Sequence, residues 1–299
     1  MDFADTLSSG ALILTDGAIE TRVMFDSDFT LDPDVQVAAM VDDPVGGPIL
    51  RGIYESYVRV AGALPLVIGT PTFRASPHFA DRAGLDVRRL NEAAVAQQRA
   101  IAGAADRPVF VAGVLGPAND AYTPDQALSA AEAAEYHAEQ ASILAGAGAD
   151  LLFAATFPAV EEAVGVTRAM AATGLPHVPS FVLGADGRVL DGTPLAEAVA
   201  RVDAQVSPRP AYVSLSCIHP SLAGRALDGV DTSRILELKA NGSRLSTDEL
   251  VQLDHAASDE PAEFADELWA VHERFGLRIL GGCCGTDDRH MAALAARMR

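Results

Sequence analysis

The chain has 299 residues, of which 49% are hydrophobic, so it can bury a sizeable core and is not a disordered chain. Its formal net charge of −19 argues against nucleic acid and anionic membrane surfaces as partners, since both repel an acidic protein. No apolar run approaches the roughly 20 residues that span a bilayer. The first residues are acidic where a secretory signal would be basic, so the protein is expected in the cytoplasm.

Short apolar runs alternate with longer helical stretches along the chain, which is typical of repeated strand–helix units around a parallel sheet. The expected strands are residues 12–19, 64–73, 108–115, 150–157, 178–183, 211–217, 234–240 and 277–283. The clearest helices between them are residues 124–146, 160–172, 195–206 and 262–275. The pattern predicts an α/β fold, a (β/α)₈ TIM barrel formed as a single domain by residues 1–299. An open, doubly wound sheet is the alternative.

A polar, acidic segment follows the seventh expected strand and covers residues 242–260. Long connections at the carboxyl ends of barrel strands carry function more often than the strands do. The segment is either a lid over the site or a surface excursion, and both remain open.

The chain contains three cysteines, and each lies at the end of an expected strand. Cys217 ends the sixth strand, and Cys283 and Cys284 end the eighth. In a barrel of this type the active site forms at the carboxyl ends of the strands, so these thiols are expected to face one mouth. In a cytosolic protein a small cysteine cluster is typical of metal binding or catalysis rather than of disulfides.

Three thiolates are a strong ligand set for Zn²⁺, which prefers sulfur and tetrahedral geometry. Three protein ligands leave the fourth position open, as in catalytic zinc sites. Two other interpretations are open. A buried cysteine can be an inert small hydrophobe, and an adjacent pair can be a redox couple, although a disulfide between neighbours is strained. The glycines on both sides of Cys283 and Cys284 favour the metal site.

The sequence resembles the homocysteine S-methyltransferase family over essentially its whole length. The segments that carry the resemblance are LTDGAIETRV, VAGVLGP, GADLLFAATFPAVEEAVG, SLSCIHP and ILGGCCGTDDRHMAALA. The resemblance implies a (β/α)₈ barrel with zinc held by Cys217, Cys283 and Cys284. It implies methyl transfer from a small donor, such as S-methylmethionine, S-adenosylmethionine or a betaine, to a homocysteine-like thiol.

The resemblance also suggests residues that bind the substrate. Asp16 matches an aspartate of the family's opening motif, near the bound amino acid, and Asn241 matches an asparagine near the site. Ala155 stands where the family usually has a glutamate that binds the amino group of homocysteine, and Thr156 follows it as a further substrate-binding candidate. Glu20 replaces a usual glycine and offers a carboxylate that can take over ammonium binding.

These departures leave the reaction and the acceptor open in part. The expected partners are a small thiol acceptor and a methyl donor, and assembly into a homo-oligomer is left open. Aromatic candidates for stabilising a cationic donor are Phe25, Phe73, Phe157 and Tyr54. His219 either lines the site or shapes its loop.

One alternative function is methyl transfer from an unusual metabolite to a thiol other than homocysteine. The other is a non-catalytic barrel that binds zinc and a thiol.

Overall fold

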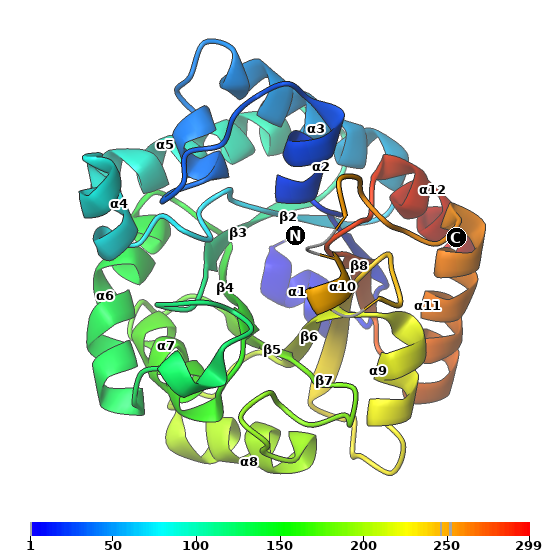
Figure 1. The fold of residues 1–299 in the computed structure, drawn as a ribbon. Coiled ribbons are helices and arrows are strands. Elements are labelled where there is room, and N and C mark those ends of the chain that lie inside the picture. The colour runs from blue at the N-terminus through cyan, green and yellow to red at the C-terminus, as the bar shows by residue number, and fades with distance from the viewer. Residues whose placement is uncertain (1, 246, 251–252) are drawn as a thin grey trace.

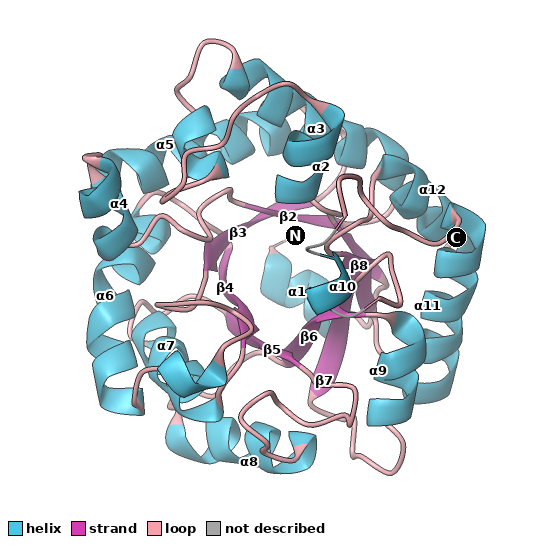
Figure 2. Cartoon of the chain, in the orientation of Figure 1, coloured by secondary structure: helices cyan, strands magenta, loops and turns pink. Residues whose placement is uncertain are grey.

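The computed structural model describes residues 2–245, 247–250 and 253–299. Eight parallel strands close into a barrel in the order β1 to β8, and β8 pairs with β1 through Ile279 opposite Ile13. The strands form an inner ring (Figure 1), and helices surround this ring (Figure 2). The predicted (β/α)₈ barrel is confirmed, and the open doubly wound sheet is excluded.

All eight expected strands are present. Their bounds are β1 Ile13–Thr15, β2 Leu66–Gly69, β3 Val109–Leu115, β4 Leu151–Phe157, β5 His177–Val182, β6 Val213–Ile218, β7 Ile235–Ala240 and β8 Ile279–Gly282. The first two are shorter than predicted, because the residues that follow them leave the sheet and line the cavity at the mouth of the barrel.

The helices fall between the strands, as predicted. Their bounds are α1 Phe3–Ser8, α2 Glu20–Asp26, η1 Val37–Met40, α3 Gly46–Ala61, α4 Pro77–Ala83, α5 Val87–Gly103, η2 Pro124–Gln126, α6 Ala130–Gly146, α7 Val160–Ala171, α8 Leu195–Gln205, α9 Pro220–Ala226, α10 Thr247–Leu250, α11 Pro261–Phe275 and α12 Asp288–Arg297. None of the described helices is long and apolar enough to cross a membrane.

The helix predicted over residues 124–146 begins later, at Ala130. Ser129 caps it, and the side chain of Glu132 accepts a hydrogen bond from the Ser129 backbone N–H, which completes a capping box. The residues before this cap form only the short 3₁₀ turn η2. The prediction placed the helix start too early because Pro124 also suits the first position of a helix.

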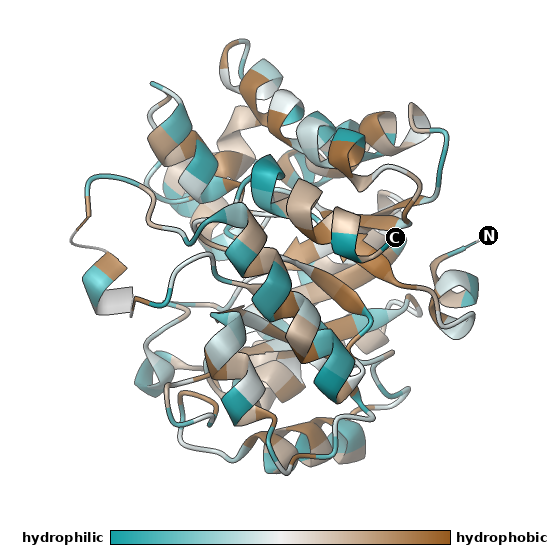
Figure 3. Cartoon of the chain, turned by 90° about the vertical axis from the view of Figure 1, so that its right-hand side faces the viewer, coloured by the Kyte–Doolittle hydropathy of each residue, from teal (hydrophilic) through white to brown (hydrophobic). Residues whose placement is uncertain are grey.

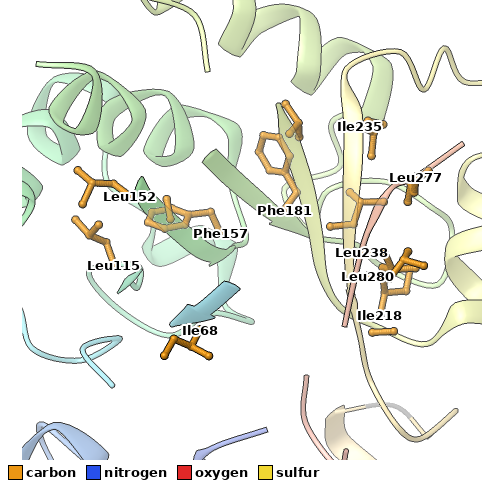
Figure 4. Packing of buried hydrophobic residues seen from close by; sticks show 14 of the residues in the cluster. Ile68, Leu115, Leu152, Phe157, Phe181, Ile218, Ile235, Leu238, Leu277 and Leu280 are labelled. Carbon is orange, nitrogen blue, oxygen red and sulfur yellow. The ribbon is translucent and has the colours of Figure 1, made fainter. Parts of the chain in front are cut away.

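The main hydrophobic core lies between the barrel and its surrounding helices. Leu152, Phe181 and Leu280 are among the buried side chains of this layer (Figure 4). Inside the barrel a second cluster includes Phe110, against which Phe3 of α1 packs with ring centroids 5.5 Å apart. Helix α1 therefore covers the amino-terminal end of the barrel, where the N-terminus also lies (Figure 3).

Gly281, on β8, lies against β1 too closely for any side chain. A Cβ atom there would overlap Oγ1 of Thr15 and lie 3.0 Å from the carbonyl oxygen of Asp16. We expect Gly281→Ala to lower the free energy of unfolding by about 1–3 kcal/mol, as overpacking does. Gly52→Ala, in helix α3 with no atom within 4 Å of the new Cβ, is the control and should raise it by about 0.5–1 kcal/mol. Chemical denaturation measures both, and equal effects would contradict the packing argument.

Candidate active site

The three cysteines meet at the carboxyl ends of β6 and β8. Their Sγ atoms all lie within 4.8 Å of one another, and those of Cys217 and Cys283 are 2.7 Å apart. Backbone bonds fix this arrangement, because the Cys283 N–H donates to the carbonyl oxygen of Ala240 on β7, the strand between them, at 2.7 Å. All three thiols are free and half-buried. They are therefore held together and remain accessible from the mouth.

The backbone at two positions of the mouth adopts a conformation that is rare outside glycine. Cys217 has φ 55° and Thr156 has φ 61°. Each lies where the pairing of its strand with the next shifts register. Such irregularities turn a side chain out of the regular pleat and are frequent beside active sites. Here they bring Oγ1 of Thr156 to 3.8 Å from Sγ of Cys217.

The cysteines shift one another's pKa values. Hydrogen bonds from Cys283 and Cys284 hold the pKa of Cys217 well below its usual range. The same interaction with Cys217 raises the pKa of Cys283 to about 12. The hydroxyl of Tyr122 also bonds to Cys217 and contributes to the lowering of that pKa. Cys217 is therefore the first of the three thiols to ionise.

The donor set fits a zinc ion. Zinc–sulfur bonds of about 2.3 Å in tetrahedral geometry place the sulfur ligands about 3.8 Å apart, and all three Sγ atoms here lie within 4.8 Å of one another. No other group of three or more metal-ligating side chains converges in this way among the described residues. Cys217, Cys283 and Cys284 are thus the residues that would hold the metal.

A cavity of about 350 Å³ extends from the three thiols into the barrel. The charged residues of its lining are Asp16, Glu20, Glu237 and Lys239, so carboxylates outnumber ammonium groups by three to one. This excess of negative charge favours ligands that carry a cationic group.

Asp16, which the resemblance places near a bound amino acid, is already occupied by partners of this chain. One oxygen of its carboxylate forms an ion pair with Nζ of Lys239, and the other accepts the Gly69 N–H at 2.7 Å. Nζ of Lys239 also donates to Oγ1 of Thr15 at 3.2 Å. Although burial lowers the pKa of Lys239, the Asp16 carboxylate raises it above its ordinary value, so the lysine stays charged.

Glu20 lies at the start of α2 and lines the cavity. Burial raises the pKa of its carboxyl, and the neighbouring Cys283 and Asp16 act in the same direction. Lys239 does not form an ion pair with it, since its ammonium is held by Asp16. Glu20 is therefore a carboxylate at the mouth that is available to a ligand.

Asn241 does not line the cavity and acts on the backbone instead. Its Nδ2 donates to the carbonyl oxygen of Cys217 at 3.1 Å, and its backbone N–H donates to Ile218. The next residue, Gly242, donates its N–H to the carbonyl oxygen of Cys284 at 2.9 Å. Asn241 and Gly242 thus tie the segment after β7 to both cysteine-bearing segments.

Asp259 secures the far end of the same segment. Its Oδ2 lies 3.1 Å from Nε2 of His219 and 3.1 Å from Arg244, and its backbone N–H donates to Gly242 at 2.7 Å. Its carbonyl oxygen lies 3.0 Å from Nε2 of His290, on α12. One residue therefore connects the segments that follow β6, β7 and β8. We call these contacts the Asp259 strap.

The comparison with known proteins agrees with this geometry. A model of the homocysteine S-methyltransferase family matches residues 13–298. The chain belongs to this family. It is 27% identical to the homocysteine S-methyltransferase of Escherichia coli K12, over 96% of this chain and 95% of that enzyme. It is 25% identical to betaine–homocysteine S-methyltransferase 1 of Mus musculus, over 83% of this chain and 64% of that enzyme.

Solved structures show the same fold. The homocysteine methyltransferase MmuM from Escherichia coli, in its metallated form, superposes with a TM-score of 0.78, covering 98% of each chain at 23% identity. The family resemblance stated from the sequence motifs is confirmed, and so is the barrel that it implies.

Within this family site, the structure decides several points that the sequence left open. His219 does not line the cavity; it caps α9 and belongs to the Asp259 strap. Of the aromatic candidates, Tyr54 and Phe73 line the cavity, whereas Phe157 packs in the core and Phe25 is 38% exposed at the surface. Ala155 does line the cavity, so position 155 contributes a methyl group and no carboxylate to the wall.

The residues of the cavity that sequence reasoning missed include Tyr122, Glu237 and Lys239. Tyr122 lies in the long connection after β3, where nothing in the sequence distinguishes it. For the other two a signal existed, because Glu237 and Lys239 alternate with leucine and alanine on β7. In a barrel strand this alternation indicates charged side chains that point inward.

Proposed function

We propose that this protein transfers a methyl group from a sulfonium or betaine-type donor to the thiol of homocysteine or a related compound. The observation that carries the proposal is the convergence of Cys217, Cys283 and Cys284 on one cavity at the barrel mouth. These three residues would hold zinc, the proposed cofactor, which would lower the pKa of the acceptor thiol and keep it nucleophilic at neutral pH.

The residues of the chain bind and orient the two substrates. Tyr54 and Phe73 offer aromatic faces to a cationic donor, and the negative lining of the cavity attracts it. Thr156 fixes the position of Cys217 at the mouth and is a proposed substrate contact. Asn241 orients the Cys217 backbone. The proposed location is the cytoplasm, where free cysteines stay reduced.

A related function has two specific observations in its favour. Asp16 already holds an ammonium group, that of Lys239, and position 155 carries no carboxylate. Both features reduce the ways in which the cavity can recognise the amino group of homocysteine. A thiol acceptor other than homocysteine is therefore the second candidate, with the same donor chemistry and the same three cysteines.

The direct test is a methyl-transfer assay on the zinc-loaded protein. S-Methylmethionine, S-adenosylmethionine and a betaine serve as donors, and homocysteine and other small thiols as acceptors. Formation of methionine from homocysteine supports the first candidate, and methylation of another thiol alone supports the second. Tight thiol binding without methyl transfer to any acceptor would overturn both and favour the non-catalytic barrel.

Glu20 is the proposed ammonium ligand at the mouth. A charge-assisted hydrogen bond contributes about 1.5–3 kcal/mol, and the lower figure applies because Glu20 is half-buried. We expect Glu20→Gln to raise the KM for homocysteine about tenfold, with little change in kcat. Glu55→Gln, on the exposed face of α3, is the control. An unchanged KM in Glu20→Gln would remove this residue from the acceptor site.

A further inference from the structure

Glu237 is a buried carboxylate that the proposed reaction does not use. Its side chain is 2% exposed, yet it lines the cavity that begins at the three cysteines. The neighbouring hydroxyl groups of Ser214 and Tyr212 act to lower the pKa of this carboxyl. Its Oε2 atom has no hydrogen-bond partner among the described residues. A buried, unpaired carboxylate oxygen is costly, so its presence on a cavity wall points to a ligand.

The charges around Glu237 specify what that ligand carries. Lys239, two residues further along β7, is the neighbouring cation, but Asp16 and Thr15 already engage its ammonium group. Burial raises the pKa of Glu237 to about 7, and Lys239 only partly offsets this effect. The carboxylate thus lacks a full counter-charge. A ligand ammonium group at Oε2 would provide one.

Glu237 lies well below the cysteines along the barrel axis. It pairs with Ile279 on β8, whereas Ala240, which accepts a hydrogen bond from Cys283, lies three residues later. Three residues of strand correspond to about 10 Å. One continuous cavity touches Glu237 and the three cysteines, and the small side chains of Ala112 and Ala155 are part of its wall. A ligand whose sulfur lies at the thiols can therefore reach Glu237 with an extended tail.

We propose that Glu237 forms a second binding subsite, deep in the barrel, which takes the amino end of an aminothiol acceptor while its sulfur lies at the three cysteines. The inference rests on the proposed function, since it assigns the acceptor class of that reaction. Glu20 recognises an ammonium group near the mouth, and Glu237 recognises one at the end of an unbranched chain. Acceptors with a terminal amine are thereby favoured over hydroxy and carboxy analogues of equal length.

The test compares amine and hydroxyl thiols of equal length for binding to the zinc-loaded protein. Isothermal titration calorimetry measures 2-aminoethanethiol, 3-aminopropane-1-thiol and 4-aminobutane-1-thiol against the corresponding hydroxythiols. We expect at least one amine to bind tenfold or more tightly than its hydroxyl analogue. Glu237→Gln should reduce that preference to within about twofold and leave the hydroxythiols unchanged. Glu55→Gln, on the exposed face of α3 and outside the cavity, is the control and should retain the preference.

Glu237→Asp provides a second test if Glu237→Gln folds poorly. The aspartate retains the negative charge but places it one methylene further from the ligand, so the preferred amine should become one carbon longer. No amine preference at any chain length, or a preference that Glu20→Gln abolishes and Glu237→Gln retains, would overturn the inference. Because binding is measured without a methyl donor, these outcomes are independent of whether methyl transfer occurs, and a failed transfer assay leaves the binding result interpretable.

Discussion

Cys283→Ser is expected to purify with little or no zinc, whereas the unsubstituted protein is expected to bind about one ion per chain. A serine hydroxyl is a poor zinc ligand, because it does not ionise at neutral pH and is harder than a thiolate. Loss of an outer partner of a metal ligand alone costs about 10–100-fold in affinity, so loss of the ligand itself should exceed the upper figure. Methyl transfer should fall at least as far. Metal analysis after gel filtration measures the first effect and the transfer assay the second.

Two further variants test the same site: Cys217→Ser removes a second thiol, and Glu237→Gln is the control. Cys217→Ser should behave like Cys283→Ser, because both thiols belong to the same group. Glu237→Gln keeps all three thiols and should retain its zinc. Stoichiometric zinc in both serine variants would show that the metal is held elsewhere and would refute the proposed site.

Asp259→Ala is expected to weaken zinc binding by about 10–100-fold although Asp259 is no ligand. The substitution removes the side-chain contacts of Asp259 with His219 and Arg244. His219 follows Cys217 by two residues, so its release loosens the segment that carries this thiol. Competition with a chromogenic chelator measures the zinc affinity.

Glu263→Ala is the matched control, because Glu263 also contacts Arg244, at 3.0 Å, and lies outside the Asp259 strap. Its zinc affinity should be unchanged. Denaturation of the metal-free proteins measures their free energies of unfolding. A loss of zinc affinity without a matching loss of stability indicates that Asp259 positions the cysteines. If zinc affinity decreases equally in both variants, or does not decrease in Asp259→Ala, the Asp259 strap does not position the cysteines.

The fold could be predicted almost completely from the sequence, for a physical reason. Strands buried on both faces are continuous apolar runs, and the helices around them carry a periodic apolar face. Both patterns are local and survive in a single sequence. The errors fell at element ends, as at Ala130, where a capping box rather than composition decides the first helical residue. The register shifts beside Thr156 and Cys217 leave no such local pattern.

The site was only partly predictable. The three cysteines could be assigned to a metal site from the sequence, because their residue type and their positions at strand ends together indicate metal ligands. The pairing of Asp16 with Lys239 joins residues 223 positions apart, and it depends on closure of the barrel between β1 and β7 by way of β8. Tertiary structure thereby gives Asp16 an internal ammonium partner that no local pattern in the sequence reveals. The substrate contacts expected for Asp16, Glu20, Thr156 and Asn241 remain predictions.

The packing of Phe3 against Phe110 closes the amino-terminal end of the barrel, and this has a kinetic consequence. Both reactants must enter, and both products must leave, through the end that carries the cysteines. A molecule seated toward Glu237 is then trapped beneath whatever arrives second. We therefore expect a compulsory order, in which the acceptor binds before the donor and its methylated product dissociates last.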